Sequence, residues 1–175
     1  MDIENEIKLL EAINKLKTLF AIDIIPTFLG AHTYPIEFKQ NHNEYLDMII
    51  QKMLPQIAEK KLARFCDAFC EVTAYSADEV NLIFAKAKEL GFNLRLHTEQ
   101  FNNIGGLELA LVQDAVSVDH LEVMTEKQIF KLGAFDTVAV LLPGVSFFLD
   151  YQFAPARKLI AVSYTHLTLP TSDLV

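Results

Sequence analysis

Apolar side chains recur at two different periods along this chain, and the two periods alternate from one end to the other. Residues 4–20 carry them three and four positions apart with Lys and Glu between, which predicts an amphipathic helix. A second helix is predicted over residues 43–60, with a kink or a restart at Pro55, because proline lacks the N–H that a helix interior needs. Two capping boxes, Ser76–Glu79 and Thr125–Gln128, predict helices that end near Leu90 and Gly133. Shorter helices are predicted over residues 107–112 and from Pro155 to Ile160.

Short apolar runs separate these helices and are bounded by glycine, proline or polar residues. Runs of this kind are typical of strands that are buried on both faces of a parallel sheet covered by helices. The predicted strands are residues 23–29, 65–71, 92–97, 115–120 and 137–142, with Gly30 and Pro143-Gly144 closing the first and the last. The fold class is therefore α/β. An open doubly wound sheet and part of a (β/α)8 barrel both fit. The chain of 175 residues is too short for a whole barrel, which usually needs about 250 residues.

Polar residues gather where successive predicted strands end. His32 follows the first strand, Glu71 ends the second, His97 the third and His120 the fourth. The carboxyl ends of parallel strands meet at one edge of a sheet, and binding sites are built there. We therefore expect the three imidazoles to project into a common mouth. Each residue also has a structural interpretation: His97 bonded to a carbonyl, His32 capping a loop, His120 paired with Asp119, and Glu71 accepting backbone N–H groups.

Composition excludes several classes of protein. The 175 residues include 15 Lys and Arg against 23 Asp and Glu, a net charge of −8 that disfavours nucleic-acid binding. The apolar fraction of 51% excludes disorder, yet no run approaches the roughly 20 apolar residues of a membrane helix. The acidic start does not resemble a signal peptide. Cys66 and Cys70 are expected to be buried, reduced thiols, which favours the cytoplasm.

Five short motifs together resemble one family. They are TFLGAH (27–32), DAFCE (67–71), LHTEQ (96–100), DHLE (119–122) and LLPG (141–144). In this order and at these separations they resemble imidazolonepropionase, a metal-dependent member of the amidohydrolase superfamily. The resemblance runs from about residue 2 to residue 160, so residues 1–160 are expected to form the central part of a hydrolase barrel, a partial TIM-type barrel with about five parallel strands. Residues 161–175 do not match the family and are interpreted as a non-native tail.

The resemblance implies a chemistry and a role for four residues. The reaction is the hydrolysis of the cyclic amide 4-imidazolone-5-propanoate to N-formimidoyl-L-glutamate in histidine degradation, with one zinc or iron. His97 matches a metal ligand, His32 and Gln100 match positions that contact the substrate, and His120 matches a histidine that assists proton transfer. These residue types suit the reaction, because a divalent metal activates water and a second imidazole can move a proton at neutral pH. Asp119 is not expected to orient His120, because neighbouring strand residues point to opposite faces.

Some parts of the family pattern have no match in this sequence. The first His-x-His metal pair, a substrate-binding Arg and Tyr, and the last Asp ligand are missing. We therefore expect a fragment that is inactive alone and self-associates through unpaired sheet edges, and a homodimer for the full-length parent. Two alternatives remain: an amidohydrolase for another ring, such as a hydantoin or a dihydropyrimidine, or a non-catalytic α/β interaction module. A substrate panel tests the first alternative, and metal analysis tests the second.

Overall fold

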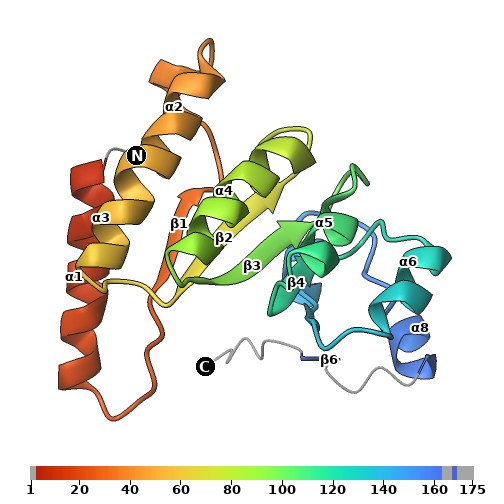
Figure 1. The fold of residues 1–175 in the computed structure, drawn as a ribbon. Coiled ribbons are helices and arrows are strands. Elements are labelled where there is room, and N and C mark those ends of the chain that lie inside the picture. Colours follow the sequence, from red (N-terminus) through yellow and green to blue (C-terminus); the bar gives the residue numbers. More distant parts are fainter. Residues whose placement is uncertain (1–2, 163–166, 169–175) are drawn as a thin grey trace.

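One parallel sheet organises the chain in the computed structural model, which describes residues 3–162 and 167–168 (Figure 1). Its six strands follow one another in the order of the sequence, and every neighbouring pair is parallel. They are β1 (Thr27–Ala31), β2 (Phe65–Cys70), β3 (Asn93–Thr98), β4 (Ser117–His120), β5 (Val138–Val140) and β6 (Leu167–Thr168). A doubly wound sheet would reverse its strand order part-way, whereas this sequential order is that of a (β/α) barrel. The fold is therefore part of a barrel, as the second of the two predicted architectures requires.

Helices connect the strands and pack on the sheet. The helical segments are α1 (Ile3–Leu19), η1 (Ile36–Phe38), α2 (His42–Met48), η2 (Ile49–Met53), α3 (Leu54–Glu59), α4 (Ala77–Glu89), α5 (Gly106–Val112), α6 (Glu126–Leu132), α7 (Pro143–Phe148) and α8 (Ala156–Ala161). Helix α1 packs on β1, α4 on β2 and β3, and α5 on β3. No helix in the described part of the chain has the length and apolar character needed to cross a membrane.

Local sequence signals placed several boundaries correctly. Ser76 Oγ accepts a hydrogen bond from Glu79 N while Ser76 N donates to the Glu79 carboxylate, so the capping box opens α4. The box of Thr125 and Gln128 opens α6 in the same way. The long predicted helix contains the π-helical turn η2, and α3 follows with Pro55 in its first turn. The irregularity predicted at Pro55 thus takes the form of a π-helical turn within a continuous helix, since proline removes one hydrogen bond from a helix interior.

Three predicted elements differ from the structure. The first strand covers Thr27–Ala31 instead of residues 23–29, so Gly30 lies within it and does not close it. A Cβ at Gly30 would meet the Phe28 ring at 2.6 Å, so glycine fits this position in the strand. Pro143 does not simply end the fifth strand but begins α7, a position in which its fixed φ favours a helix. β6 adds a sixth strand, parallel to β5, within the predicted tail 161–175. Apart from Ala161, Val162 and β6, that tail lies outside the described residues.

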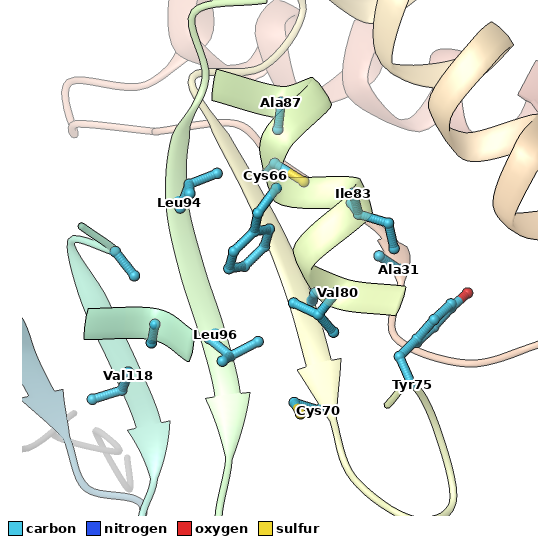
Figure 2. Close-up of a cluster of buried hydrophobic side chains, with 14 of the residues drawn as sticks. Ala31, Cys66, Cys70, Tyr75, Val80, Ile83, Ala87, Leu94, Leu96 and Val118 are labelled. Atoms are coloured by element: carbon cyan, nitrogen blue, oxygen red, sulfur yellow. The ribbon is translucent and has the colours of Figure 1, made fainter. Parts of the chain in front are cut away.

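The two faces of the central strands differ: one face packs in the hydrophobic core and the other carries polar side chains. Cys66, Cys70, Leu94, Leu96 and Val118 are buried in the core, which α4 completes with Val80, Ile83 and Ala87 (Figure 2). Both cysteines are free and buried, and burial raises the pKa of Cys70 to about 12, so neither is suited to act as a nucleophile. The predicted packing role of the thiols is confirmed. The alternate residues of β2, β3 and β4 point to the opposite face, and that face carries the polar site.

Candidate active site

Three imidazoles meet at the carboxyl ends of the strands. His32 directly follows β1, His97 lies near the end of β3, and His120 is the last residue of β4. The ring centroids of His32 and His97 are 4.7 Å apart, and those of His97 and His120 are 5.5 Å apart. Phe69 of β2 lies 6.3, 6.5 and 6.4 Å from the rings of His32, His97 and His120. The structure thus brings the three histidines into one mouth, as the strand-end pattern predicts.

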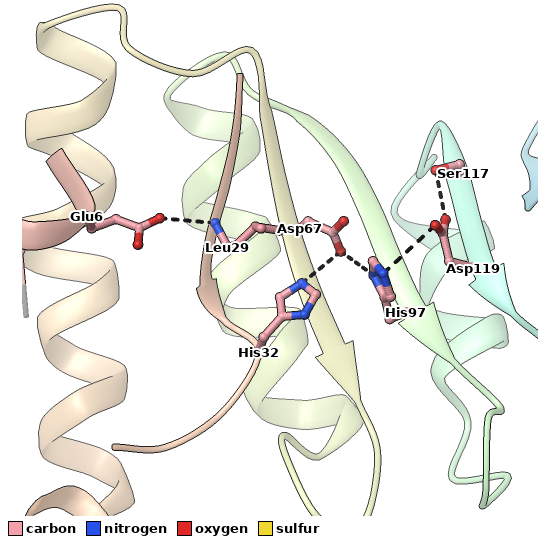
Figure 3. A network of polar contacts seen from close by, with 7 residues as sticks. All are labelled: Glu6, Leu29, His32, Asp67, His97, Ser117 and Asp119. Atoms are coloured by element: carbon pink, nitrogen blue, oxygen red, sulfur yellow. Dashed lines mark hydrogen bonds and ion pairs between the residues drawn. The ribbon is translucent and has the colours of Figure 1, made fainter. Parts of the chain in front are cut away.

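Asp67 of β2 joins two of these histidines (Figure 3). Its carboxylate oxygen Oδ1 is 2.9 Å from His97 Nδ1 and 3.2 Å from His32 Nε2. The residue is only 4% exposed. Burial raises the pKa of Asp67, but its contacts with His32 and His97 outweigh that effect and leave the pKa lowered. A buried carboxylate therefore stays ionised between two imidazoles.

Asp119 of β4 flanks His97 on the other side. The two residues are register partners in the sheet, and Asp119 Oδ2 lies 3.9 Å from His97 Nε2. Ser117 Oγ donates to the other carboxylate oxygen at 3.3 Å. Burial lowers the pKa of His97, but the hydrogen bond to Asp67 and the charges of Asp67 and Asp119 raise it above the ordinary value. Asp119 thus faces His97, and the expectation that it would not orient His120 agrees with this placement.

His120 reaches the mouth through an unusual backbone. Strand alternation would turn it to the same side as Val118, which packs in the core. His120 instead has a φ of +83° and Leu121 a φ of +70°, both in the left-handed region. Such conformations cost on the order of 1–3 kcal/mol each in non-glycine residues and cluster at functional sites. The departure from strand geometry explains why His120 joins His97 although the two occupy positions of opposite parity.

The donor atoms of this site fit a divalent metal. His32, Asp67 and His97 each offer one ligand atom, and the three atoms lie within 4.8 Å of one another. Two imidazoles and a carboxylate are ligands that zinc and ferrous iron accept, and catalytic sites often use three protein ligands with one position left for water. The Asp67 contact engages His97 Nδ1, which leaves Nε2 as the nitrogen available to a metal.

Gln100 and Glu71 are linked through the loop after β3. Glu71 accepts N–H groups from Val72, Phe101 and Asn102, which confirms its predicted structural role. Gln100 lies in the loop thus held and is 8% exposed. Among the described residues no hydrogen bond or ion pair joins Gln100 to the three histidines, so its contact with substrate stays a prediction.

No role was predicted for Asp67, although it begins the motif DAFCE (67–71). The available signal was a charged residue inside an apolar strand, two positions before Phe69 and therefore on the same face. Register was the missing information. Only the pairing of β1, β2 and β3 shows that Asp67 lies between His32 and His97.

Comparison with curated proteins identifies relatives of this chain. It is 45% identical to the imidazolonepropionase of Thermoanaerobacter pseudethanolicus over 182 residues, which cover 99% of this chain and 44% of that protein. It is 43% identical to the enzyme of Streptococcus pyogenes serotype M6, over 99% of this chain and 41% of that protein. The chain is a homologue of the imidazolonepropionases. It spans less than half the length of these relatives, and no family model matches it.

Solved structures support the fold. Guanine deaminase from C. acetobutylicum superposes with a TM-score of 0.69 at 12% identity, over 96% of this chain and 43% of that one. A triazine hydrolase variant gives a TM-score of 0.66 at 14% identity, over 91% of this chain and 40% of that one. The chain therefore has the fold of part of a (β/α) barrel, with parallel strands and flanking helices like those of these structures.

Proposed function

We propose that the whole protein to which this chain belongs is a cytoplasmic hydrolase that opens the ring of 4-imidazolone-5-propanoate, giving N-formimidoyl-L-glutamate, with one zinc or iron. The homology with imidazolonepropionases supports the substrate. One structural observation carries the chemistry. His32, Asp67, His97 and His120 converge at the carboxyl ends of neighbouring strands, where barrel enzymes build their sites.

Each residue has a distinct task in this proposal. His97 binds the metal through Nε2, while Asp67 holds its Nδ1 and so fixes the orientation of the ring. His32 contacts the substrate from the end of β1, and Gln100 does so from the loop after β3. His120 takes up and returns a proton during ring opening, because an imidazole changes protonation near neutral pH.

The metal, when bound, polarises the ring carbonyl and lowers the pKa of a water molecule. The protein side of the site complements this chemistry. Asp67 and Asp119 supply negative charge around His97, which favours a bound cation. The left-handed backbone at His120 keeps a proton carrier within the same mouth.

The whole protein, incubated with 4-imidazolone-5-propanoate, tests the proposal. We expect loss of the ring chromophore, formation of N-formimidoyl-L-glutamate, and slower turnover of hydantoin and dihydropyrimidine. The His97→Ala variant should lose activity, while His42→Ala, a matched change at a histidine that stacks on Tyr34, should retain it. Preference for another ring, unchanged turnover by His97→Ala, or a protein that binds no divalent metal would overturn the proposal.

A further inference from the structure

Glu122 follows His120 by two residues, and the side chains of the two residues lie side by side. Its Oε1 atom is 3.5 Å from His120 Nδ1. The two side chains are only 1% and 9% exposed, so both polar groups are buried together. Among the described residues His120 Nδ1 has no hydrogen-bond partner, and Glu122 Oε2 has none either. A buried nitrogen without a partner next to a buried carboxylate is costly unless the two pair.

The carboxylate of Glu122 is held in place from α7. Ser146 Oγ donates a hydrogen bond of 3.0 Å to Glu122 Oε1, and Gln152 Nε2 donates one of 3.0 Å to the Glu122 carbonyl. These contacts tie the segment after β4 to a part of the chain more than twenty residues later. Glu122 therefore has a fixed position from which it can act on His120.

The same segment is also tied to the end of β3. Leu121 N donates to the Thr98 carbonyl at 3.2 Å, and Val123 N donates to the Glu99 carbonyl at 2.9 Å. These bonds tie the backbone that follows His120 to the end of β3. The imidazole is thus presented to Glu122 by a backbone that has little freedom to turn away.

We infer that Glu122 is a positioning residue for His120: it accepts the Nδ1–H of the imidazole and keeps Nε2 free of a proton. This inference rests on the proposed role of His120 in proton transfer. The hydrogen bond at one ring nitrogen decides which nitrogen carries the proton, and an unprotonated Nε2 is the form that can act as a base. His120 Nδ1 and Glu122 Oε1 are 3.5 Å apart, and catalytic hydrogen bonds are often long in structures without substrate.

The tautomer of His120 can be measured directly in this chain by long-range proton–nitrogen NMR. The chain has five histidines, and a His120→Gln variant assigns the signal. The chelator-treated protein is observed at a pH at which the NMR spectrum itself shows a neutral His120 ring. We expect the Nδ1–H form. Glu122→Leu removes the acceptor and should shift His120 toward the Nε2–H form, whereas Glu122→Gln keeps an acceptor oxygen and should preserve Nδ1–H.

Asp119→Asn is the matched control, because Asp119 adjoins His120 in the sequence but faces His97, and it should leave the His120 tautomer unchanged. An Nε2–H form in the unmodified protein overturns the inference, as does a folded Glu122→Leu variant with an unchanged tautomer. If Glu122→Leu does not fold, the tautomer of the unmodified protein decides. The measurement uses no substrate, so a failure of the proposed hydrolase activity would not alter its outcome.

Discussion

Asp67 Oδ1 accepts a 2.9 Å hydrogen bond from His97 Nδ1 across the boundary between β2 and β3. The bond joins the two central strands of the site. It also selects the nitrogen of His97 that remains available, because an imidazole bonded through Nδ1 can bind a metal only through Nε2. The proposed metal site therefore depends on a residue whose side chain is almost completely buried.

Asp67→Asn should weaken metal binding by the whole protein about 10- to 100-fold, the usual effect of losing a carboxylate behind a metal-binding histidine. The asparagine oxygen can still accept from His97, so the protein should fold, but the negative charge is lost. Competition with a metal-binding dye measures the affinity. Asp23→Asn, at an exposed position before β1, is the control and should have no effect. Equal metal affinities of the Asp67→Asn variant and the unmodified protein would show that Asp67 does not contribute to metal binding.

His32 and His97 should respond differently to the same substitution in the whole protein. His97→Ala should purify with less than half of the metal of the unmodified protein, because the proposed ligand is gone. His32→Ala should keep its metal and show a raised KM, because we assign His32 to the substrate. Metal analysis of both variants and steady-state kinetics of His32→Ala separate the two roles. Loss of metal from His32→Ala would instead make His32 a ligand, which the 4.8 Å cluster with Asp67 and His97 also permits.

Glu6 of α1 is 1% exposed and accepts the Leu29 N–H at 3.2 Å, and burial raises its pKa above the ordinary 4.5. A carboxyl whose folded-state pKa is raised contributes stability that is fully present below pH 4.5 and is lost as the pH rises through the folded-state pKa. Glu6→Gln keeps the acceptor and removes the charge. Its free energy of unfolding, relative to the unmodified protein, should therefore be higher at pH 7 than at pH 4.

Urea denaturation of this chain at the two pH values measures that difference. Glu4→Gln, on the exposed side of the same helix, serves as the control. A difference in stability between Glu6→Gln and the unmodified protein that does not change with pH would contradict the prediction.

Gly106 begins α5 where the helix approaches the end of β3. A Cβ at this position would overlap the side chain of Thr98 and lie 3.0 Å from the Cβ of Cys70. Gly106→Ala should therefore lower the free energy of unfolding by roughly 1–3 kcal/mol, as is typical of overpacking. Gly144→Ala is the matched control, because no atom lies within 4 Å of a Cβ there, and it should be neutral or slightly stabilising. Equal stability of the two variants, measured by urea denaturation, would refute this account.

Features set by neighbouring residues were predictable from the sequence. The caps of Ser76 and Thr125 depend on a partner three residues away, and the irregular helical turn before Pro55 depends on one missing N–H. The convergence of the histidines was also predictable, because parallel strands in sequential order bring their carboxyl ends together.

Features set by distant contacts were not predictable. Helix α7 follows the proline that looked like a strand end, and its Ser146 bonds to Glu122 of another loop. The left-handed φ of His120 reverses the alternation from which side chains were assigned to faces. The place of Asp67 between two histidines follows from register alone. In each case the feature depends on a residue more than twenty positions away or on an unusual backbone conformation.

The sequential order of the strands also bears on how the chain folds. Each strand hydrogen-bonds to the one that precedes it in the sequence, so every pairing closes a loop of moderate length. Parallel pairing is slow compared with helix or hairpin formation, but the sequential order keeps each of these loops shorter than a non-sequential order would. During synthesis, β1, β2 and β3 can join as each emerges from the ribosome, which would bring Asp67 and His97 together before β4 has emerged.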